Sequence, residues 1–444
     1  MSEVGEKRVA PEPTTFRGIW YGSGQRNTLP GHSFVYAGAK ATYSAWHRPM
    51  AVYAPAVNKT FFVFGDADNR PAISVFDHAD STFAPPLALG VNFDSNAHRN
   101  PSLLIDDDGF LYVFYGYHGN QQPIHVLRSL RPHDISAWTR RADLTGGNGS
   151  YANPWQLRPG EILVPHRQPT GWCFKRSHDQ GATWSDTVEL ASFSSYEGTS
   201  TVYGLTTGET GPYPRAVHFA GSRLGGGSPE AIRTLHLWAR RYNVYYACSR
   251  DGGDTWQRSD GSPYELPITE NAAEKVHDSG GLGTWIKDLV VVPDAGPLIL
   301  FLDGDAETYR SQWKIARQTG AGWDIVDVTT SNHMYDGGAL CAVGPGDLRL
   351  YGPSAQSQPG CDGGNIEEWR SADNGATWTR TRTLTEGVER SHNHVKTAVN
   401  HEQSDGQFRV MWSCGDGQSP PDDTEVTMYY FGDGMDAPRR IEIS

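Results

Sequence analysis

The chain has 444 residues, including 50 Gly, 28 Pro and 14 Trp, and carries a formal net charge of −13 at pH 7. An acidic chain without a dense Lys/Arg tract is not a generic nucleic-acid binder, and an anionic partner would need a local basic pocket. No stretch reaches the roughly 18 consecutive apolar residues of a membrane span, and none shows a long apolar pattern at helical spacing.

The N-terminal residues carry no recognisable targeting segment. Met1–Lys7 lacks the apolar core of a secretory signal, so we expect the protein to be cytoplasmic, or secreted with its signal removed. We expect residues 1–15 to form a flexible N-terminal segment. The five cysteines are odd in number and far apart, which favours buried free thiols over a disulfide framework.

Short strand-like runs follow one another along the chain, separated by turn clusters such as Asp106–Gly109 and Gly344–Asp347. The runs are Thr60–Phe64, Leu111–Tyr115, Glu161–Val164, Leu235–Trp238, Val244–Ala247, Asp288–Val292, Leu298–Leu302, Leu348–Tyr351 and Phe408–Trp412. Strand, turn and strand at this spacing is typical of a β-propeller, which is a single closed ring. We therefore predict one domain over residues 1–444, and we expect a monomer.

Two histidines flank one predicted hairpin within the segment Asn96–Asn120. His98 precedes the first strand of this hairpin and His118 follows the second. A hairpin returns the chain to the end at which it started, so the two imidazoles should lie near each other. Histidine is the side chain best suited to proton transfer near neutral pH. The pair is therefore a candidate for acid–base catalysis, with surface or turn histidines as the alternative.

Three copies of one octapeptide, Ser-x-Asp-x-Gly-x-Thr-Trp, begin at Ser177, Ser249 and Ser371. The Asp of this pattern accepts hydrogen bonds from its own turn, the Gly supplies a positive φ, and the Trp covers a hairpin end. The repeat resembles the Asp-box, or bacterial neuraminidase repeat, of sialidase-like β-propellers. The resemblance implies an all-β, seven-bladed β-propeller, with six blades as the alternative, in which the boxes are structural. Degenerate copies are expected at Ser129–Trp138 and Gln318–Trp323.

A narrower resemblance starts in the segment that holds the two histidines. Asn96–Leu103, Asp108–Phe114 and Gly116–Asn120 are similar to the propeller polysaccharide lyases, which include ulvan lyases and rhamnose-glucuronate lyases. The likeness covers nearly the whole chain, in matching order. The further matches are Asn58–Phe62, Phe76–His78, Trp285–Leu289, His333–Asp336, Gly363–Trp369 and Ser391–Val395.

This resemblance implies a set of site residues. His98 and His118 match the catalytic histidine positions, while Tyr151 and Arg167 match a catalytic tyrosine and an arginine that binds the substrate carboxylate. The position of Arg167 at the end of a strand-like run, just before the first Asp-box, supports this assignment. Arg240 is a second candidate for binding an anion.

The implied chemistry is β-elimination at a uronic acid, and it explains why these residue types are needed. A lyase must neutralise the uronate carboxylate, remove the proton at C5 and protonate the leaving oxygen at C4. An arginine fork suits the first task, and histidine or tyrosine suits the other two. We expect Arg167 to bind the carboxylate of an anionic rhamnose- and uronate-containing polysaccharide or oligosaccharide. His98, His118 and Tyr151 then share the roles of base and acid, and no cofactor is required.

Metal binding is a separate hypothesis. Related lyases can carry a structural ion, and His277, His333 and His394 are candidate ligands for zinc, or for calcium as the alternative ion. Three histidines among sixteen easily arise by chance. Three unrelated structural histidines are therefore the simpler interpretation.

Two other functions remain open at this point. A sialidase-type glycoside hydrolase shares the Asp-box, but Phe16–Tyr21 lacks the proline of the Arg-Ile-Pro signature typical of that class. A noncatalytic carbohydrate- or protein-binding propeller would use exposed aromatic side chains without turnover. The sequence leaves the exact polysaccharide and the choice between internal and terminal cleavage undecided.

Overall fold

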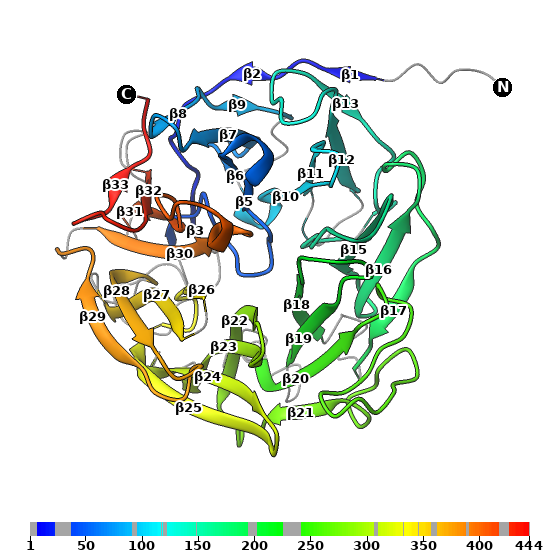
Figure 1. Ribbon diagram of the computed structural model, residues 1–444, viewed down its shortest axis with the longest axis vertical. Helices are drawn as coiled ribbons and strands as arrows, with labels where there is room; N and C mark the ends of the chain where they lie inside the picture. The colour runs from blue at the N-terminus through cyan, green and yellow to red at the C-terminus, as the bar shows by residue number, and fades with distance from the viewer. Residues whose placement is uncertain are drawn as a thin grey trace.

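The protein is a ring of antiparallel sheets arranged around one centre (Figure 1). The computed structural model describes residues 7–22, 37–90, 96–116, 118, 122–147, 149–193, 202–224, 241–305, 310–331, 333–344, 346–356, 362–387, 390–416 and 426–443. The only helices in these ranges are the single-turn 3-10 helices η1 (Pro55–Val57), η2 (Ala97–Arg99) and η4 (His401–Gln403). Within the same ranges no helix is long and apolar enough to cross a membrane. The predicted all-β class is confirmed.

Seven blades follow one another in chain order, and the first strand of each is the innermost. Blade 1 contains β5 (Ala51–Ala54), β6 (Lys59–Gly65), β7 (Pro71–Asp77), β8 (Thr82–Phe83) and β9 (Leu87–Ala88). Blade 2 contains β10 (Ser102–Ile105), β11 (Leu111–Gly116), β12 (Ile124–Ser129) and β13 (Trp138–Arg140). Blade 3 contains β14 (Trp155–Arg158), β15 (Glu161–Arg167), β16 (Trp172–Ser177) and β17 (Val188–Ala191). Blade 4 contains β18 (Val202–Gly208), β19 (Val217–Leu224), β20 (Arg241–Ser249) and β21 (Glu274–His277).

The last three blades complete the ring. Blade 5 contains β22 (Gly283–Val292), β23 (Gly296–Asp305), β24 (Arg310–Thr319) and β25 (Gly322–Ser331). Blade 6 contains β26 (Ala339–Gly344), β27 (Asp347–Gln356), β28 (Gly364–Ser371) and β29 (Thr379–Thr383). Blade 7 contains β30 (Ser391–Thr397), β31 (Val410–Gly415), β32 (Thr427–Phe431) and β33 (Arg439–Arg440). A single pairing of Gly364 with His392 joins blades 6 and 7 into one eight-stranded sheet.

Of the flexible segment expected over residues 1–15, the part from Arg8 to Pro13 instead pairs with the ring. β1 (Arg8–Val9) pairs with β13, and β2 (Glu12–Pro13) pairs with β9, along the outer edges of blades 2 and 1 (Figure 1). An outer strand leaves a row of unpaired backbone groups that a passing segment can satisfy, which gives residues 8–13 a fixed place. The chain then turns inward to β3 (Trp20–Gly22), which pairs with β4 (Ala37–Ala39).

The three Asp-boxes occupy equivalent turns between the third and fourth strands of blades 3, 4 and 6. In the last of them, the Asp373 carboxylate accepts from the Ser371 hydroxyl at 2.7 Å and from the Thr377 backbone N–H at 2.9 Å. Gly375 has a φ of +85°, as the pattern predicts. The degenerate copies Ser129–Trp138 and Gln318–Trp323 lie at the same turns of blades 2 and 5. The boxes are therefore scaffold elements of the outer hairpins.

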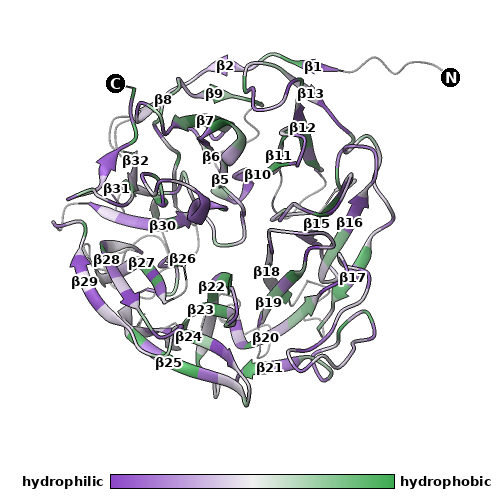
Figure 2. Cartoon of the chain, viewed as in Figure 1, coloured by the Kyte–Doolittle hydropathy of each residue, from purple (hydrophilic) through white to green (hydrophobic). Residues whose placement is uncertain are grey.

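The core lies between neighbouring blades. Middle strands such as β6 and β11 are covered on both faces, so their sequences are continuously apolar rather than alternating. The exposed outer strand β29 reads Thr-Arg-Thr-Arg-Thr, and Figure 2 shows this contrast between middle and outer strands. The predicted strand runs lie in these blades, except that Leu235–Trp238 is outside the described residues and Phe408–Trp412 enters β31 only at Val410.

Candidate active site

The two histidines meet at the centre of the ring. His98 lies in η2, just before β10, and His118 follows the end of β11. Their ring centroids are 4.0 Å apart with an interplanar angle of 16°, so the imidazoles stack face to face. His98 is buried, whereas His118 is half-buried. The hairpin prediction is confirmed, and the second histidine is the more accessible one.

Hydrogen bonds hold His98 on both sides of its ring. The Oδ1 atom of Asn96 lies 3.0 Å from the backbone nitrogen of His98 and 2.6 Å from Nδ1 of the imidazole. The Nε2 atom lies 3.2 Å from the hydroxyl of Tyr43. His47 adds a contact of 3.0 Å from its Nε2 atom to the carbonyl oxygen of His98. Both the backbone and the ring of His98 are thus fixed.

Tyr151 and Arg167 come from blade 3 and lie beside this pair. The backbone groups of Ser150 and Arg167 exchange two hydrogen bonds, of 3.0 and 2.8 Å, which carry Tyr151 to the start of β14. The Tyr151 ring centroid lies 5.8 Å from that of His118 and 6.4 Å from that of His98. Tyr151 has a φ of +61°, a left-handed conformation that is uncommon for a side chain of this size and is often retained at functional sites.

Arg167 presents a guanidinium without a protein counter-ion. It lies over the ring of Tyr203 at 4.4 Å, and its buried Nε atom has no hydrogen-bond partner. Among the described residues, no carboxylate lies within ion-pair distance of this side chain. A guanidinium held by an aromatic face and left without a carboxylate partner is suited to bind one from a ligand.

A second arginine enters the same site, one position after the predicted one. Arg240 lies outside the described residues, whereas Arg241 begins β20 and is buried. Its guanidinium lies over the rings of Tyr203 at 4.1 Å, Trp46 at 4.8 Å and Trp285 at 3.6 Å. This aromatic box fixes the cation and shields it from water.

Burial and the two arginines set the protonation states of the site. Burial, followed by the nearby cations, lowers the pKa of His118 to about 3, and burial with the neighbouring His118 holds the pKa of His98 well below its usual range. Burial also raises the pKa of Tyr151 well above its usual range. At neutral pH the site therefore holds two neutral imidazoles and one protonated phenol.

A buried polar network supports the site from blades 5 to 7. Lys40 pairs with Asp362 at 2.7 Å, and both side chains are almost fully buried. His394 lies 3.3 Å from the same carboxylate, and its ring packs against Tyr43 with centroids 4.9 Å apart. Asp336 accepts from the Ser331 hydroxyl at 2.5 Å, and burial raises its pKa to about 7.

The structure does not assemble the predicted metal site. His277 ends the outermost strand of blade 4 and contacts Asp303 at 2.9 Å, whereas His333 precedes β26 and His394 lies in β30 at the centre. In the ranges that the structure describes, no group of three His, Cys, Asp or Glu side chains is placed to hold a metal ion. His277, His333 and His394 are therefore not a shared ligand set: His277 contacts Asp303 of blade 5, whereas His394 lies 3.3 Å from Asp362.

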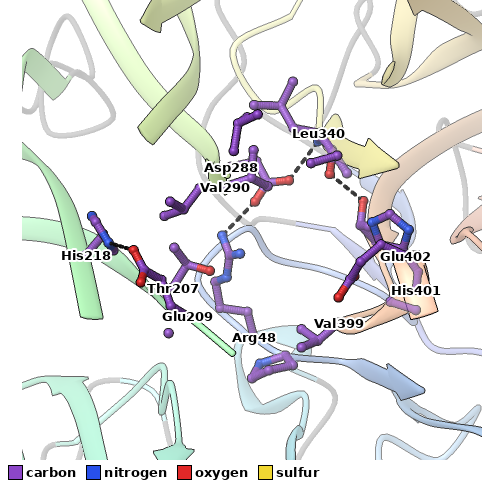
Figure 3. A pocket seen from close by; sticks show the side chains of 18 of the residues that line it. Arg48, Thr207, Glu209, His218, Asp288, Val290, Leu340, Val399, His401 and Glu402 are labelled. Carbon is purple, nitrogen blue, oxygen red and sulfur yellow. Dashed lines mark hydrogen bonds and ion pairs between the residues drawn. The ribbon is translucent and has the colours of Figure 1, made fainter. Parts of the chain in front are cut away.

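A cavity separate from these residues lies where the innermost strands end (Figure 3). Its volume is about 620 Å³, and it is lined by the carboxyl ends of β18, β22, β26 and β30. Figure 3 shows Arg48 and Asp288 joined across its floor, with Glu209 paired to His218 at one side. None of the site residues described above lines it. Those residues lie instead where first strands begin (His98, Tyr151), where second strands end (His118, Arg167) and where a third strand begins (Arg241). The ring therefore has two distinct ends.

Residues 40–50, here called the channel segment, separate these two ends. Trp46 and His47 pack against Tyr151 with ring centroids 5.4 and 5.2 Å apart. The next residue, Arg48, instead faces the cavity and donates to Asp288 at 2.6 Å. The buried ammonium of Lys396 holds the segment by donating to the carbonyl oxygens of Ser44 and His47.

The sequence analysis brought four residues to one site and missed their supporting neighbours. It predicted His98, His118, Tyr151 and Arg167, which the structure places together. It missed Tyr43, Trp46, Asn96, Tyr203 and Arg241. The pair Arg240–Arg241 was a usable signal for the second cation, and Asn96 stands two residues before His98. Nothing in the local sequence indicates that Tyr43 or Tyr203 reaches the centre.

The chain matches known proteins over most of its length. A family model described as a BNR repeat-containing family member matches residues 59–331. An ulvan lyase of Nonlabens ulvanivorans is 21% identical over 415 residues, which covers 83% of this chain and 85% of the relative.

Solved structures share the same fold. A polysaccharide lyase structure described as a PL25 ulvan lyase superposes with a TM-score of 0.72 at 18% identity, covering 96% of this chain and 98% of the other. A structure of the same kind bound to -[GlcA(1-4)Rha3S]- superposes with a TM-score of 0.71 at 19% identity, covering 95% and 97% of the two chains. These likenesses establish the propeller fold of this chain.

Proposed function

Because this chain belongs to the BNR repeat-containing family, we propose that its propeller carries a polysaccharide lyase site for an anionic, uronate-containing polysaccharide of the ulvan class. One observation carries the proposal. Among the residues that the structure describes, the guanidinium of Arg167 has no carboxylate partner and lies beside two neutral imidazoles and a protonated phenol. This set suits proton removal next to a bound carboxylate.

The relatives support the choice of substrate class. The curated relative is named an ulvan lyase, and one structural neighbour is bound to a glucuronate linked to rhamnose 3-sulfate. A repeat of that kind carries one carboxylate and one sulfate. Two guanidiniums in one site, those of Arg167 and Arg241, match a substrate with anionic groups on neighbouring sugars.

The proposed reaction is a β-elimination without water or cofactor. A base takes the proton from C5 of the uronate, the C5–H electron pair forms the C4=C5 double bond, and the C4–O bond breaks. The leaving oxygen takes a proton from an acid. Arg167 binds the carboxylate, so that negative charge developing towards it is stabilised when C5 loses its proton. Arg241 provides the second anion contact from its aromatic box.

The geometry favours His118 as the base and Tyr151 as the acid. His118 is half-buried and neutral, whereas His98 is buried behind it with its Nε2 atom in contact with Tyr43. Tyr151 is protonated and its ring centroid lies 5.8 Å from that of His118, so both side chains can reach one substrate sugar bound beside them. His98 then acts as the platform that supports the base.

The test is a substrate screen with ulvan, gum arabic and sialosides, read for unsaturated product, released sialic acid or binding alone. We expect product with the ultraviolet absorbance of an unsaturated uronate from ulvan. His118→Gln and Arg167→Met should lower kcat/KM by about a thousandfold or more, whereas Arg131→Met, at an exposed position, should match the wild type. A saturated reducing sugar as product would exclude a lyase.

A further inference from the structure

Hydrogen bonds to both ring nitrogens of His98 fix its orientation and its tautomer, as a side chain that supports the neighbouring base His118 requires. The Oδ1 atom of Asn96 accepts the backbone N–H of His98, which identifies it as the amide oxygen, an acceptor only. The same atom lies 2.6 Å from Nδ1 of the imidazole, so Nδ1 must carry the proton. Nε2 is then the acceptor, and the hydroxyl of Tyr43, 3.2 Å away, donates to it.

We propose that Tyr43 and Asn96 are positioning residues that clamp His98 as the Nδ1-protonated, neutral tautomer beneath His118. The proposal rests on the function proposed above for this site. Tyr43 and Asn96, here called the histidine clamp, come from segments far apart in sequence and meet only at His98. Neither is assigned a contact with substrate.

Several further contacts make the clamp rigid. The backbone carbonyl of Tyr43 accepts from the side chain of Asn100 at 2.5 Å. The backbone N–H of Tyr43 donates to the backbone carbonyl oxygen of Lys40 at 3.0 Å. The Tyr43 ring packs edge-on against His98 and His394, with centroids 5.1 and 4.9 Å away. The phenol is therefore oriented by its surroundings and not by its bond to His98 alone.

The clamp has a consequence for the base. The imidazoles of His98 and His118 stack at 4.0 Å, so a positive charge on one opposes protonation of the other. If His98 became charged, His118 would accept the C5 proton less readily. A hydrogen-bond donor that points at Nε2 stabilises the neutral form of His98. His118 can then accept the proton from C5.

The titratable and charged groups that act on the pKa of His98 in the described part of the chain all act in the same direction. The imidazoles of His47 and His118 and the guanidiniums of Arg167 and Arg241 all disfavour a positive charge on it. The rings of three tyrosines, Tyr21, Tyr43 and Tyr151, also lie against the ring of His98. Among the neighbours named here, Tyr43 is the one whose hydroxyl contacts Nε2 directly, so its removal has a specific effect on that nitrogen.

The first experiment reads His98 without substrate. Protein labelled with 15N-histidine, with His98 identified by comparison with His98→Gln, should show the proton on Nδ1 in the wild type. Tyr43→Phe should raise the titration midpoint of His98 by about 0.5 to 1 pH unit, because it loses the bond to the neutral form. Asn96→Asp should also raise it, through its added charge. A wild-type proton on Nε2, or midpoints unchanged in both variants, would overturn the proposal.

The second experiment reads catalysis. For Tyr43→Phe we expect the acid limb of the kcat–pH profile to move upward with the His98 midpoint, kcat to fall about tenfold on that limb, and KM to stay near the wild-type value. Tyr53→Phe is the matched control, since it removes a phenol that donates to Asn58 at 2.9 Å away from the site. An equal loss of activity in both variants, or an unmoved acid limb, would contradict the clamp. A wild type without lyase activity would count against the proposed function, while the labelling experiment would still decide the clamp.

Discussion

At the residue scale, the site combines a guanidinium that has no carboxylate partner among the described side chains with neutral histidines. Arg167 has no carboxylate partner among the described side chains, and the two central histidines are neutral because they are buried near cations. A hydrolase of the sialidase type needs a carboxylic acid at its centre. The neighbours of His118 are instead arginines, an imidazole and phenols, which suits proton transfer by imidazole and phenol.

Tyr151 provides a test of the acid at this scale. Tyr151→Phe removes only the phenol hydroxyl, so the packing against Trp46 and His47 should persist. We expect kcat to fall by about two to four orders of magnitude at every pH with KM little changed, since the acid is needed only as the C4–O bond breaks. A variant that kept more than a tenth of the wild-type kcat on the polymer would reassign the acid.

At the element scale, the channel segment determines which end of the ring can carry the chemistry. It places Tyr43, Trp46 and His47 on one side and Arg48 on the other. The innermost strands begin at the site and end at the cavity. This cavity is consequently separate from the proposed chemistry, and the Asp-boxes lie on outer hairpins away from both.

The Asp-boxes are expected to affect stability and not turnover. Asp373→Ala removes the acceptor for Ser371 and Thr377, and because the turn is exposed we expect a loss of about 1 kcal/mol in unfolding free energy with kcat unchanged. Hydrogen bonds lower the pKa of Asp373 to about 2. A lowered carboxyl pKa adds stability above about pH 4 that disappears as the pH falls towards 2. The difference between variant and wild type, measured by urea unfolding, should therefore shrink below pH 4.

At the scale of the whole molecule, the ring closes through contacts between its first and last blades. Val52 of β5 pairs with Val399 just beyond β30, and His78 contacts Asp405 at 2.6 Å. β1 and β2 add a second layer outside blades 2 and 1. The two contacts between the first and last blades join residues more than three hundred positions apart, so closure depends on the complete ring. The monomeric state stays a prediction.

The ring as a whole should be sensitive to mild acid. Burial is the leading cause of a lowered pKa in eight of the described histidines: His47, His98, His118, His133, His166, His392, His394 and His401. A histidine with a lowered folded-state pKa adds stability above pH 6.5 that is lost as the pH falls towards the folded value, because the unfolded chain then binds more protons. Asp336, whose pKa is raised to about 7, has the opposite effect, because its contribution to stability increases as the pH falls from 7 to 3.8. This single carboxyl opposes a larger number of histidines.

We therefore expect the Tm to decline steadily from pH 6.5 to pH 4 in calorimetry. His166→Gln, which removes one such histidine away from the proposed chemistry, should reduce the slope of this decline. A flat Tm between pH 6.5 and 5 would show that these imidazoles are protonated in the folded chain.

The sequence was most informative where the physical signal is local. The Ser, Asp, Gly and Thr of each box form a turn from hydrogen bonds within eight residues, so Asp373 and its two counterparts could be placed without a structure. The His98–His118 pairing followed from one hairpin for the same reason. The described residues do not bring His277, His333 and His394 together as metal ligands. That prediction required three loops far apart in the sequence to converge, and the local sequence carries no information about the distance between such loops.

By itself, the sequence therefore determined the strand-rich class and the outer hairpins, and it predicted that His98, His118, Tyr151 and Arg167 share one site. These depend on repeat spacing, hairpin geometry and family resemblance. Only the tertiary structure decided that Tyr43 and Asn96 hold His98, that Arg241 joins Arg167, and that the channel segment separates the site from the cavity. The physical reason is ring closure: seven blades bring their innermost strands to one axis, and contacts across that axis have no counterpart in neighbouring residues of the chain.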